Sequence, residues 1–235
     1  MAMTRLDKLL ADSGTVSRSE ARDLVRAGRV TVDGAVARSA AEKYDVATAT
    51  VCVDGEEVNC SARRYLMLYK PAGLLSATED ARQSTVLDLL PVQLRRQGLF
   101  PVGRLDKDTT GLLLLTNDGD FAHRVISPKH RVPKVYRATV EGRLSEADVL
   151  AFAGGLTLGD GTQCLPAKLE IMEPSLGQVT VFEGKYHQVK RMFAARDKHV
   201  TALHRVSVGG VVLDAALEPG DFRELSPEEI KAVFA

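Results

Sequence analysis

Several features that would place a protein in a definite class are missing from this sequence. None of its 235 residues fall in an apolar run long enough to span a membrane as a helix, and its charged N-terminus lacks the apolar stretch of a signal peptide. Its three cysteines, Cys52, Cys60 and Cys164, are odd in number and lack metal-ligand spacing. We therefore expect a cytoplasmic protein with free thiols, no bound metal and no membrane association.

The chain also has no net charge, since 31 basic residues balance 31 acidic ones. Neutrality argues mildly against a nucleic-acid partner, because phosphate contacts usually require an excess of Lys and Arg. The distribution weakens this objection: residues 121–143 and residues 185–205 each carry six basic side chains and one acidic side chain. Two such segments can attract RNA locally, or they can be ordinary solvated faces.

No internal repeat or low-complexity segment organises the chain. Short apolar strand patterns alternate with short helical patterns along its length, and 45% of the residues are hydrophobic, enough for a substantial core. This mixture favours an α+β fold over a doubly wound parallel sheet. We expect a small module in residues 1–60 and a larger domain in residues 61–235.

Two short helices are expected near the N-terminus. Residues 4–7 have the spacing of a capping box, with Asp7 in place of the usual Glu, and residues 17–20 form a complete one. Arg18, Arg22 and Arg26 recur at intervals of four, which places them on one face of the second helix. Such a face suits RNA phosphates, although a polar helix exterior is the ordinary alternative.

Most of residues 4–55 resemble the S4 RNA-binding domain. The resemblance rests on Arg-Leu-Asp-Lys-Leu-Leu near the start and on Arg-Val-Thr-Val-Asp-Gly at residues 29–34. It implies that Arg18, Arg22 and Arg26 bind RNA.

The most informative stretch is residues 100–119. Four charged residues, Arg104, Asp106, Lys107 and Asp108, lie between two glycines and precede the apolar run of residues 112–115. A buried strand that follows a charged, glycine-bounded loop indicates side chains held at the mouth of a cleft. A solvated charged turn would have the same local composition.

Gly-Arg-Leu-Asp at residues 103–106, followed by Thr-Gly-Leu-Leu-Leu-Leu-Thr-Asn-Asp-Gly, is similar to the signature of RNA pseudouridine synthases that act on ribosomal RNA. The resemblance implies that Asp106 is the catalytic aspartate. It also implies a catalytic domain built on a mixed, mainly antiparallel sheet with flanking helices.

Pseudouridine formation breaks the N1–C1′ bond of uridine and remakes the link through C5, so it needs no redox cofactor or metal. A carboxylate suits this work because it is ionised at neutral pH without activation. Asp106 can capture the sugar, add to the uracil, or act as a base on the ribose. The residue type leaves these three routes open.

Three further segments resemble motifs of the same family. Residues 183–192 resemble the motif whose cation pairs with the catalytic aspartate, which implies Lys190 in that role, with Arg191 as the alternative. Residues 134–136 resemble the motif whose tyrosine packs against uracil, which implies Tyr136. RNA contacts are expected from the remaining polar residues of these motifs and of residues 70–73 and 103–106, namely Lys70, Arg104, Lys134, His187, Gln188 and Arg191.

The family resemblance is nearest to its small-subunit branch. It implies a monomeric enzyme that modifies one uridine of 16S ribosomal RNA, within a partly assembled subunit and without a cofactor. Alternatives are a paralogue acting on 23S RNA, and a catalytically silent RNA-binding factor in ribosome assembly. A glycoside hydrolase using Asp106 and Asp108 is also conceivable, although two positions on one loop give poor geometry for flanking a bond.

Overall fold

The computed structural model describes residues 3–14, 16–46, 48–58 and 63–235. These residues form two compact units, one from Met1–Arg64 with Leu90–Leu99 and the other from Tyr65–Leu89 with Phe100–Ala235. Because residues 59–62 lie outside the described part of the chain, the expected boundary between residues 60 and 61 stays a prediction.

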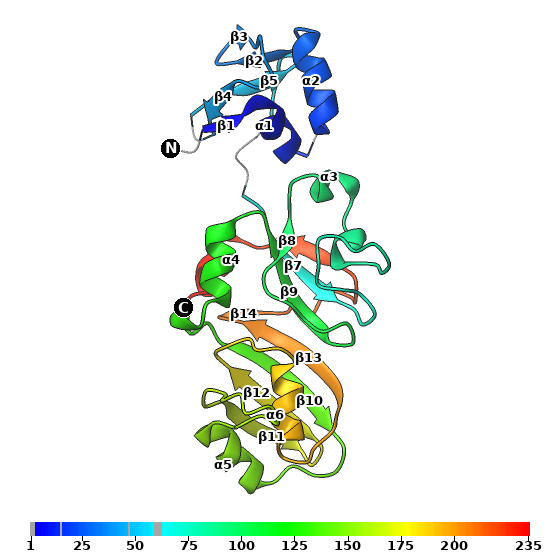
Figure 1. The fold of residues 1–235 in the computed structure, drawn as a ribbon, viewed down its shortest axis with the longest axis vertical. Helices are drawn as coiled ribbons and strands as arrows, with labels where there is room; N and C mark the ends of the chain where they lie inside the picture. The colour runs from blue at the N-terminus through cyan, green and yellow to red at the C-terminus, as the bar shows by residue number, and fades with distance from the viewer. Residues whose placement is uncertain (1–2, 15, 47, 59–62) are drawn as a thin grey trace. The chain divides into compact units, whose positions relative to one another are not determined.

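The N-terminal unit is a small α/β module (Figure 1). Its helices pack on short strands around an apolar core that includes Leu6, Leu10, Ala21 and Val30. Strands β3, β2, β5 and β6 form one antiparallel sheet, and β1 pairs with β4. The elements of this unit are β1 (Met3–Arg5), α1 (Leu6–Asp12), α2 (Arg18–Arg26), β2 (Val30–Val32), β3 (Ala35–Val36), β4 (Lys43–Asp45), β5 (Val51–Val53), β6 (Glu56–Glu57) and α3 (Val92–Arg95).

The two N-terminal helices begin in different ways. Helix α2 has the predicted capping box, in which the Ser17 side chain accepts from the Glu20 N–H and the Glu20 carboxylate accepts from the Ser17 N–H. The predicted box at residues 4–7 is wrong, because these residues belong to β1 and the start of α1, whose N-cap is Arg5. Asp7 instead binds the side chains of Arg5 and Arg22.

The larger unit is built on a nine-stranded mixed sheet, which confirms the predicted fold class. Its main strands follow the order β11-β12-β10-β13-β9-β7-β15, with β14 on β13 and β8 on β9. Every pairing is antiparallel except that of β9 with β13. The strands are β7 (Tyr65–Lys70), β8 (Phe100–Pro101), β9 (Thr110–Thr116), β10 (Lys134–Val140), β11 (Lys168–Glu173), β12 (Leu176–Val181), β13 (Val200–Val208), β14 (Val211–Val212) and β15 (Phe222–Glu224).

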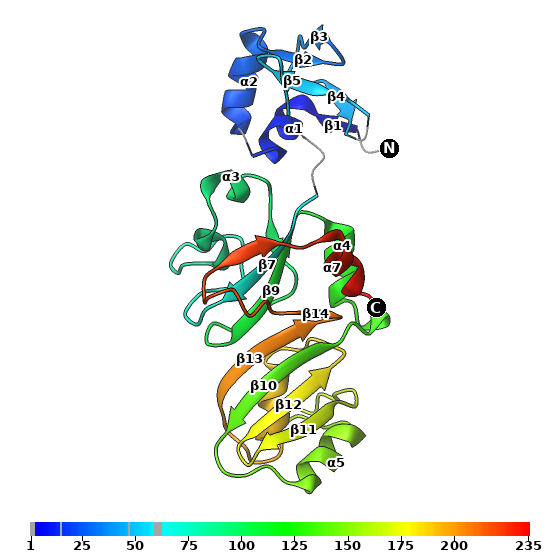
Figure 2. The ribbon, with the colours of Figure 1, turned by 180° about the vertical axis from the view of Figure 1, so that it is seen from behind.

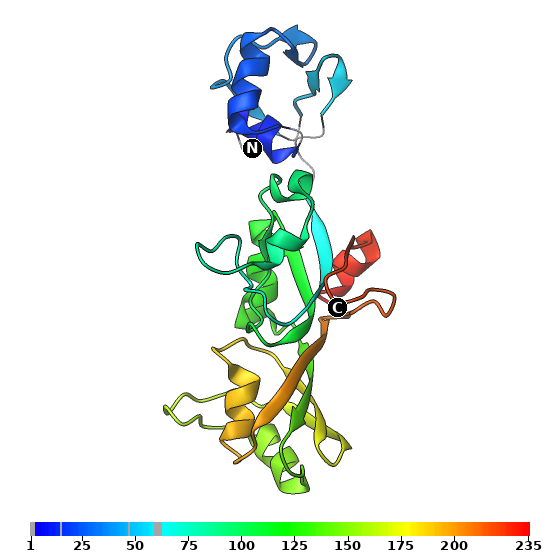
Figure 3. The ribbon, with the colours of Figure 1, turned by 90° about the vertical axis from the view of Figure 1, so that its right-hand side faces the viewer.

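Helices flank this sheet. In the view of Figure 2, α4 and α7 lie side by side, where Phe121 meets Phe234 edge to face at 5.4 Å between ring centroids. Figure 3 shows the strands nearly edge-on, with α6 on one side of β13. The helical elements are η1 (Val86–Leu89), α4 (Gly119–Ile126), η2 (Pro128–His130), α5 (Glu146–Gly154), α6 (Gln188–Ala194) and α7 (Pro227–Ala232). No helix among the described residues is both long and apolar enough to cross a bilayer.

Two apolar cores lie on the two halves of the sheet. One includes Ala138, Phe152 and Phe193 and covers the β10–β12 half, and the other includes Met67 and Leu112 on the β7–β9 half. The halves are joined by the parallel pairing of β9 with β13, which spans two residue pairs. The pairing of β7 with β9, by comparison, spans six residue pairs.

Gly111 sits at this junction. Its φ is +104°, and a Cβ atom there would lie 2.3 Å from the carbonyl oxygen of Arg205. Only glycine therefore allows β9 to approach β13 this closely. The register aligns Tyr136, Arg205, Gly111 and Lys70 in one row across four neighbouring strands.

Candidate active site

A buried lysine, Lys70, holds the loop that leads into β9. Lys70 has no exposed surface, and its ammonium donates to the carbonyl oxygens of Pro71, Lys107 and Thr109 at 2.9, 3.2 and 2.9 Å. Burial lowers the pKa of Lys70 to about 8. Because two of these carbonyls follow Asp106 in sequence, the ammonium fixes the loop that presents Asp106.

Each carboxylate oxygen of Asp106 lies near one basic group. Oδ2 is 3.1 Å from the Nζ of Lys190, and Oδ1 is 3.3 Å from the Nε2 of His187. Both partners come from the start of α6, on the other half of the sheet from β9. The side chain of Asp106 is 23% exposed, so the carboxylate is partly shielded from water and still open to a substrate. The predicted pairing of Asp106 with Lys190 is therefore present in the structure.

Asp108 is a second partner of the same ammonium. The Nζ of Lys190 donates to its Oδ1 at 2.6 Å, a shorter contact than the one with Asp106. This hydrogen bond lowers the pKa of Asp108. Burial opposes the charged form of Lys190, but hydrogen bonds with Asp108 and Asp106 outweigh it and raise the pKa of the ammonium. One cation thus bridges two carboxylates.

The turn before α6 is fixed by a buried polar network. Gln188 donates from Nε2 to Glu183 Oε1 at 2.8 Å and accepts the Lys185 N–H at 3.0 Å. Glu183 also binds the Lys185 ammonium at 2.6 Å. His187 caps the helix with φ +47°, a left-handed conformation that is unfavourable for a residue with a Cβ. The network holds this strained turn, and with it His187 and Lys190.

Tyr136 is tied to the strand that follows the Asp106 loop. Its hydroxyl accepts a hydrogen bond from Arg205 Nη1 at 3.3 Å, and Arg205 Nε donates to the Leu112 carbonyl at 2.7 Å. Arg205 is 4% exposed, and its Nη2 has no hydrogen-bond partner among the described residues. The tyrosine is partly buried and packs against the core of the β10–β12 half. Arg205 therefore fixes its hydroxyl relative to β9.

Three of the predicted RNA contacts are not supported by the structure. Lys70 is fully buried, and Lys134 is 8% exposed and donates to the Val125 carbonyl at 2.9 Å. Gln188 is 6% exposed, and its amide is used within the turn. Each side chain binds the protein's own polar groups and has little surface left, so burial disfavours the predicted RNA contact at these three positions.

The other predicted contacts remain accessible to different degrees. Arg104 is exposed on the Asp106 loop. Arg191, the alternative to Lys190, donates to the Tyr186 carbonyl and pairs with Asp160 at 2.6 Å. The structure therefore places Lys190, and not Arg191, at Asp106.

In the N-terminal unit, a basic hollow of about 330 Å³ lies beside α2. It is lined by four arginines, Arg5, Arg22, Arg26 and Arg38. Two of them were among the predicted RNA-binding residues, and the third predicted residue, Arg18, is on the same helix. Arg5 and Arg38 come from outside α2, so helical spacing could not have found them. The carboxylate of Asp7 is buried and accepts hydrogen bonds from Arg5 and Arg22.

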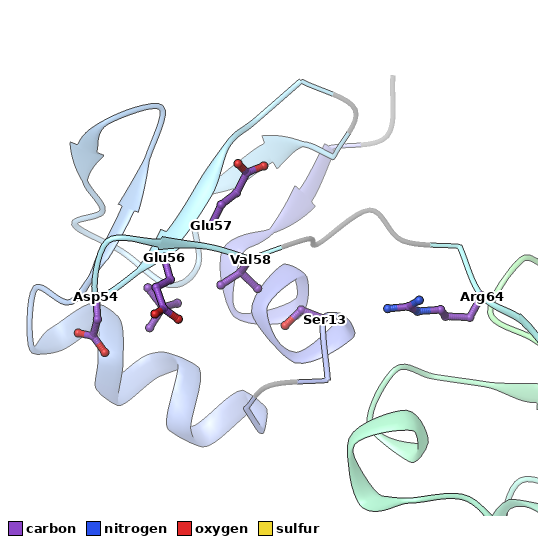
Figure 4. Close-up of a pocket in the computed structure, with 7 residues that line it drawn as sticks. Ser13, Asp54, Glu56, Glu57, Val58 and Arg64 are labelled. Atoms are coloured by element: carbon purple, nitrogen blue, oxygen red, sulfur yellow. The ribbon is translucent and has the colours of Figure 1, made fainter. Parts of the chain in front are cut away.

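A larger hollow of about 490 Å³ in the same unit has the opposite charge (Figure 4). Asp54, Glu56 and Glu57 line it, together with Ser13, Val53, Val58 and Arg64. Three carboxylates repel phosphate, which makes this hollow a poor candidate for RNA.

Asp108, Arg205 and Tyr186 were not predicted as site residues. Asp108 carried a signal, because it lies two positions after Asp106 in a loop already singled out. Arg205 is almost a hundred residues from Asp106, and only strand register places it beside Gly111. No local pattern could have revealed that placement.

Comparison with known proteins identifies the family. Residues 64–195 match the model of RNA pseudouridylate synthases, and residues 4–47 match the S4 domain. An uncharacterized RNA pseudouridine synthase of Bacillus subtilis is 49% identical over 96% of both chains. Ribosomal small subunit pseudouridine synthase A of Escherichia coli is 44% identical, over 97% of this chain and 99% of the relative.

A solved structure agrees with these relatives. The crystal structure of a pseudouridylate synthase superposes with a TM-score of 0.70 and 38% identity, covering 97% of this chain and 99% of the other. The predicted family, the S4 module and the class of enzyme are thus confirmed. The chain belongs to the RNA pseudouridine synthase family and carries an N-terminal S4 domain.

Proposed function

We propose that this enzyme converts one uridine of 16S ribosomal RNA to pseudouridine, with Asp106 as the catalytic carboxylate. The observation that carries the proposal is the position of Asp106 between Lys190 and His187, on a loop fixed by the buried ammonium of Lys70. The choice of 16S RNA is supported by relatives from Escherichia coli and Vibrio cholerae, both named ribosomal small subunit pseudouridine synthase A.

In the proposed mechanism the target uridine leaves the RNA stack and enters the site as a single nucleotide. Lys190 aims the Asp106 carboxylate through their 3.1 Å ion pair, so that it can act on the sugar, the uracil or a ribose proton. The N1–C1′ bond breaks, the uracil turns, and C5 bonds to C1′ while its proton is released to water. Tyr136 packs against the uracil, and Arg104 takes the place of the displaced nucleotide in the stack or binds its phosphate.

The S4 domain supplies the second part of the proposal. The arginines of its basic hollow, with Arg18, bind RNA phosphates and position the substrate without reading its sequence. Because the whole chain is neutral, we expect weak binding to naked RNA and tighter binding to a partly assembled small subunit. Equal affinity for the two would contradict this expectation. The enzyme is proposed to act as a monomer in the cytoplasm, where ribosomal subunits are assembled.

Tritium release tests the reaction directly, because the C5 hydrogen leaves during isomerisation. We would incubate unmodified 16S RNA, labelled at uridine C5, with the intact protein and with Asp106→Asn. The intact protein should release one equivalent, and the nearly isosteric variant should be slower by at least about 10³-fold. RNA retention by both proteins would show that the variant still folds.

The same assay separates the alternatives. Release from 23S RNA alone would indicate a paralogue with the other subunit as its target. Retention of RNA with no release from either RNA, bare or in particles, would favour a silent assembly factor. A glycoside hydrolase is disfavoured because Asp106 and Asp108 share one ammonium, whereas hydrolysis usually needs a carboxyl on each side of the bond.

A further inference from the structure

An exposed aromatic ring lies next to the catalytic carboxylate. Tyr186 is 76% exposed and is stacked on the imidazole of His187, with 3.8 Å between ring centroids and 19° between planes. The same imidazole lies 3.3 Å from Asp106. Tyr186 therefore stacks on the outer side of His187, and His187 in turn contacts the carboxylate of Asp106.

The protein fixes the backbone that carries this ring. The Tyr186 carbonyl accepts a hydrogen bond from Arg191 Nη1 at 3.2 Å, and Arg191 is itself paired with Asp160. On the other side, the network of Glu183 and Gln188 fixes the turn. A large aromatic side chain that is exposed, on a fixed backbone and stacked on a neighbouring ring, indicates a surface prepared for a ligand.

We propose that the stacked pair of Tyr186 and His187 is a platform for the base of a nucleotide next to the target uridine. The proposal rests on the proposed function, since a uridine that leaves its stack removes a stacking partner from its neighbour. An aromatic ring beside the site can replace that partner, because every base offers a flat π-face to an aromatic side chain. The residues on either side of Tyr186 in sequence, Lys185 and His187, are polar, which suits an RNA strand better than an apolar partner surface.

The platform has a different task from Tyr136. The hydroxyl of Tyr136 is fixed by Arg205, and its ring packs partly in the core of the β10–β12 half, as suits a single base enclosed in the site. Tyr186 has one ring face covered by His187 and is otherwise open. The two rings therefore serve two nucleotides, and Tyr186 adds affinity for the strand beside the target whichever base is stacked on it.

The absence of tryptophan from the chain allows a direct test. The Tyr186→Trp variant carries a single indole at the platform, and Leu150→Trp carries one at a matched exposed position, since Leu150 is 73% exposed on α5. Unmodified 16S RNA should quench the fluorescence of Tyr186→Trp well beyond that of Leu150→Trp, which corrects for light absorbed by the RNA. Equal quenching in the two variants would overturn the platform.

Steady-state tritium release gives a second readout. Replacing the ring in Tyr186→Ala should raise KM by about 5- to 100-fold, the range expected for one lost base stack, with kcat changed by less than about threefold. Tyr186→Phe, which keeps the ring, should stay near the intact protein. An unchanged KM in Tyr186→Ala, or an equal loss in Tyr186→Phe, would contradict the proposal. Neither result would affect the proposed function, which is tested separately by tritium release from 16S RNA with the intact protein and with Asp106→Asn.

Discussion

The two units of this enzyme use positive charge in opposite ways. In the S4 domain the cationic side chains are largely exposed, with Arg22 at 54% and Arg26 at 78%. In the catalytic unit Lys70 is fully buried, and the Lys190 side chain is 24% exposed, bound to two carboxylates. An exposed arginine on a helix is available to RNA, whereas an enclosed lysine organises the protein. Exposure, rather than charge in the sequence, separates the two roles.

The sharpest test of this difference is Lys190. Lys190→Met leaves Asp106 and Asp108 without their shared cation, so the rate at saturating RNA should fall by about 10²-fold or more, as expected when a reacting group is misplaced by about 1 Å. RNA affinity should change little, because this lysine serves the carboxylates. Single-turnover tritium release measures the rate, and filter binding measures the affinity. A large loss of RNA affinity at an unchanged rate would show that Lys190 binds RNA and does not organise the two carboxylates.

The second test removes a buried cation from the protein interior. Lys70→Met removes the ammonium from three carbonyl oxygens, of which, among the described residues, only that of Lys107 keeps a second hydrogen bond, from the Gly73 N–H. We expect the free energy of unfolding of the catalytic unit to fall by about 2–4 kcal/mol. Lys107→Met is the matched control, because Lys107 is exposed on the same loop, and it should stay within about 0.5 kcal/mol. Urea denaturation followed by circular dichroism measures both. Equal stability of the two variants would show that Lys70 does not organise the loop.

The third test addresses the exposed arginines. Replacing Arg18, Arg22 and Arg26 together by Gln should lower RNA affinity by about 10- to 100-fold and reduce the salt dependence of binding by about two, since each phosphate contact contributes about 0.7–0.9 to the slope. The rate at saturating RNA should stay nearly constant. Asp23→Asn, which frees Arg26 from its 2.8 Å ion pair, should tighten binding slightly. A salt slope equal to that of the intact protein would show that these arginines do not meet phosphates.

The smallest expected effect concerns the acid beneath the basic hollow. Hydrogen bonds, above all from Arg5, lower the pKa of Asp7 from 3.8 to about 2. A lowered folded-state pKa stabilises the fold above the unfolded value near pH 4, and this stabilisation is lost as pH falls toward 2. Asp7→Asn should therefore cost about 1 kcal/mol at pH 7, because the arginine partners are half exposed, and almost nothing near pH 2. Hydrogen exchange of the α1 and α2 amides at pH 7 and near pH 2 measures the loss of stability, which should be larger at pH 7. An equal loss at the two pH values would contradict this prediction.

Local signals in the sequence predicted much of this molecule. Capping residues and an apolar run correctly predicted α2 and β9, because these elements are determined by neighbouring residues. The family motifs led to Asp106 and Lys190, which the fold brings within 3.1 Å. The catalytic roles of these residues stay predictions until the variants are measured.

The failures share a physical cause. Lys70 and Lys134 were expected to contact RNA because of the family motifs, but each ammonium donates to backbone carbonyls in the interior. The start of α1 was misplaced because Thr4 and Arg5 pair with β4 across the module. In each case the deciding partner is distant in sequence. Neither periodicity nor composition contains that information.

The short pairing of β9 with β13 gives the sheet a natural hinge. Among the described strands, two residue pairs connect the halves that carry Asp106 and Lys190, and each half has its own core. Bending at this hinge would change the distance between Asp106 and Lys190 while both cores stay intact. We expect the enzyme to separate these two side chains in this way when an RNA strand arrives, and to bring carboxylate and ammonium together again once the uridine is bound.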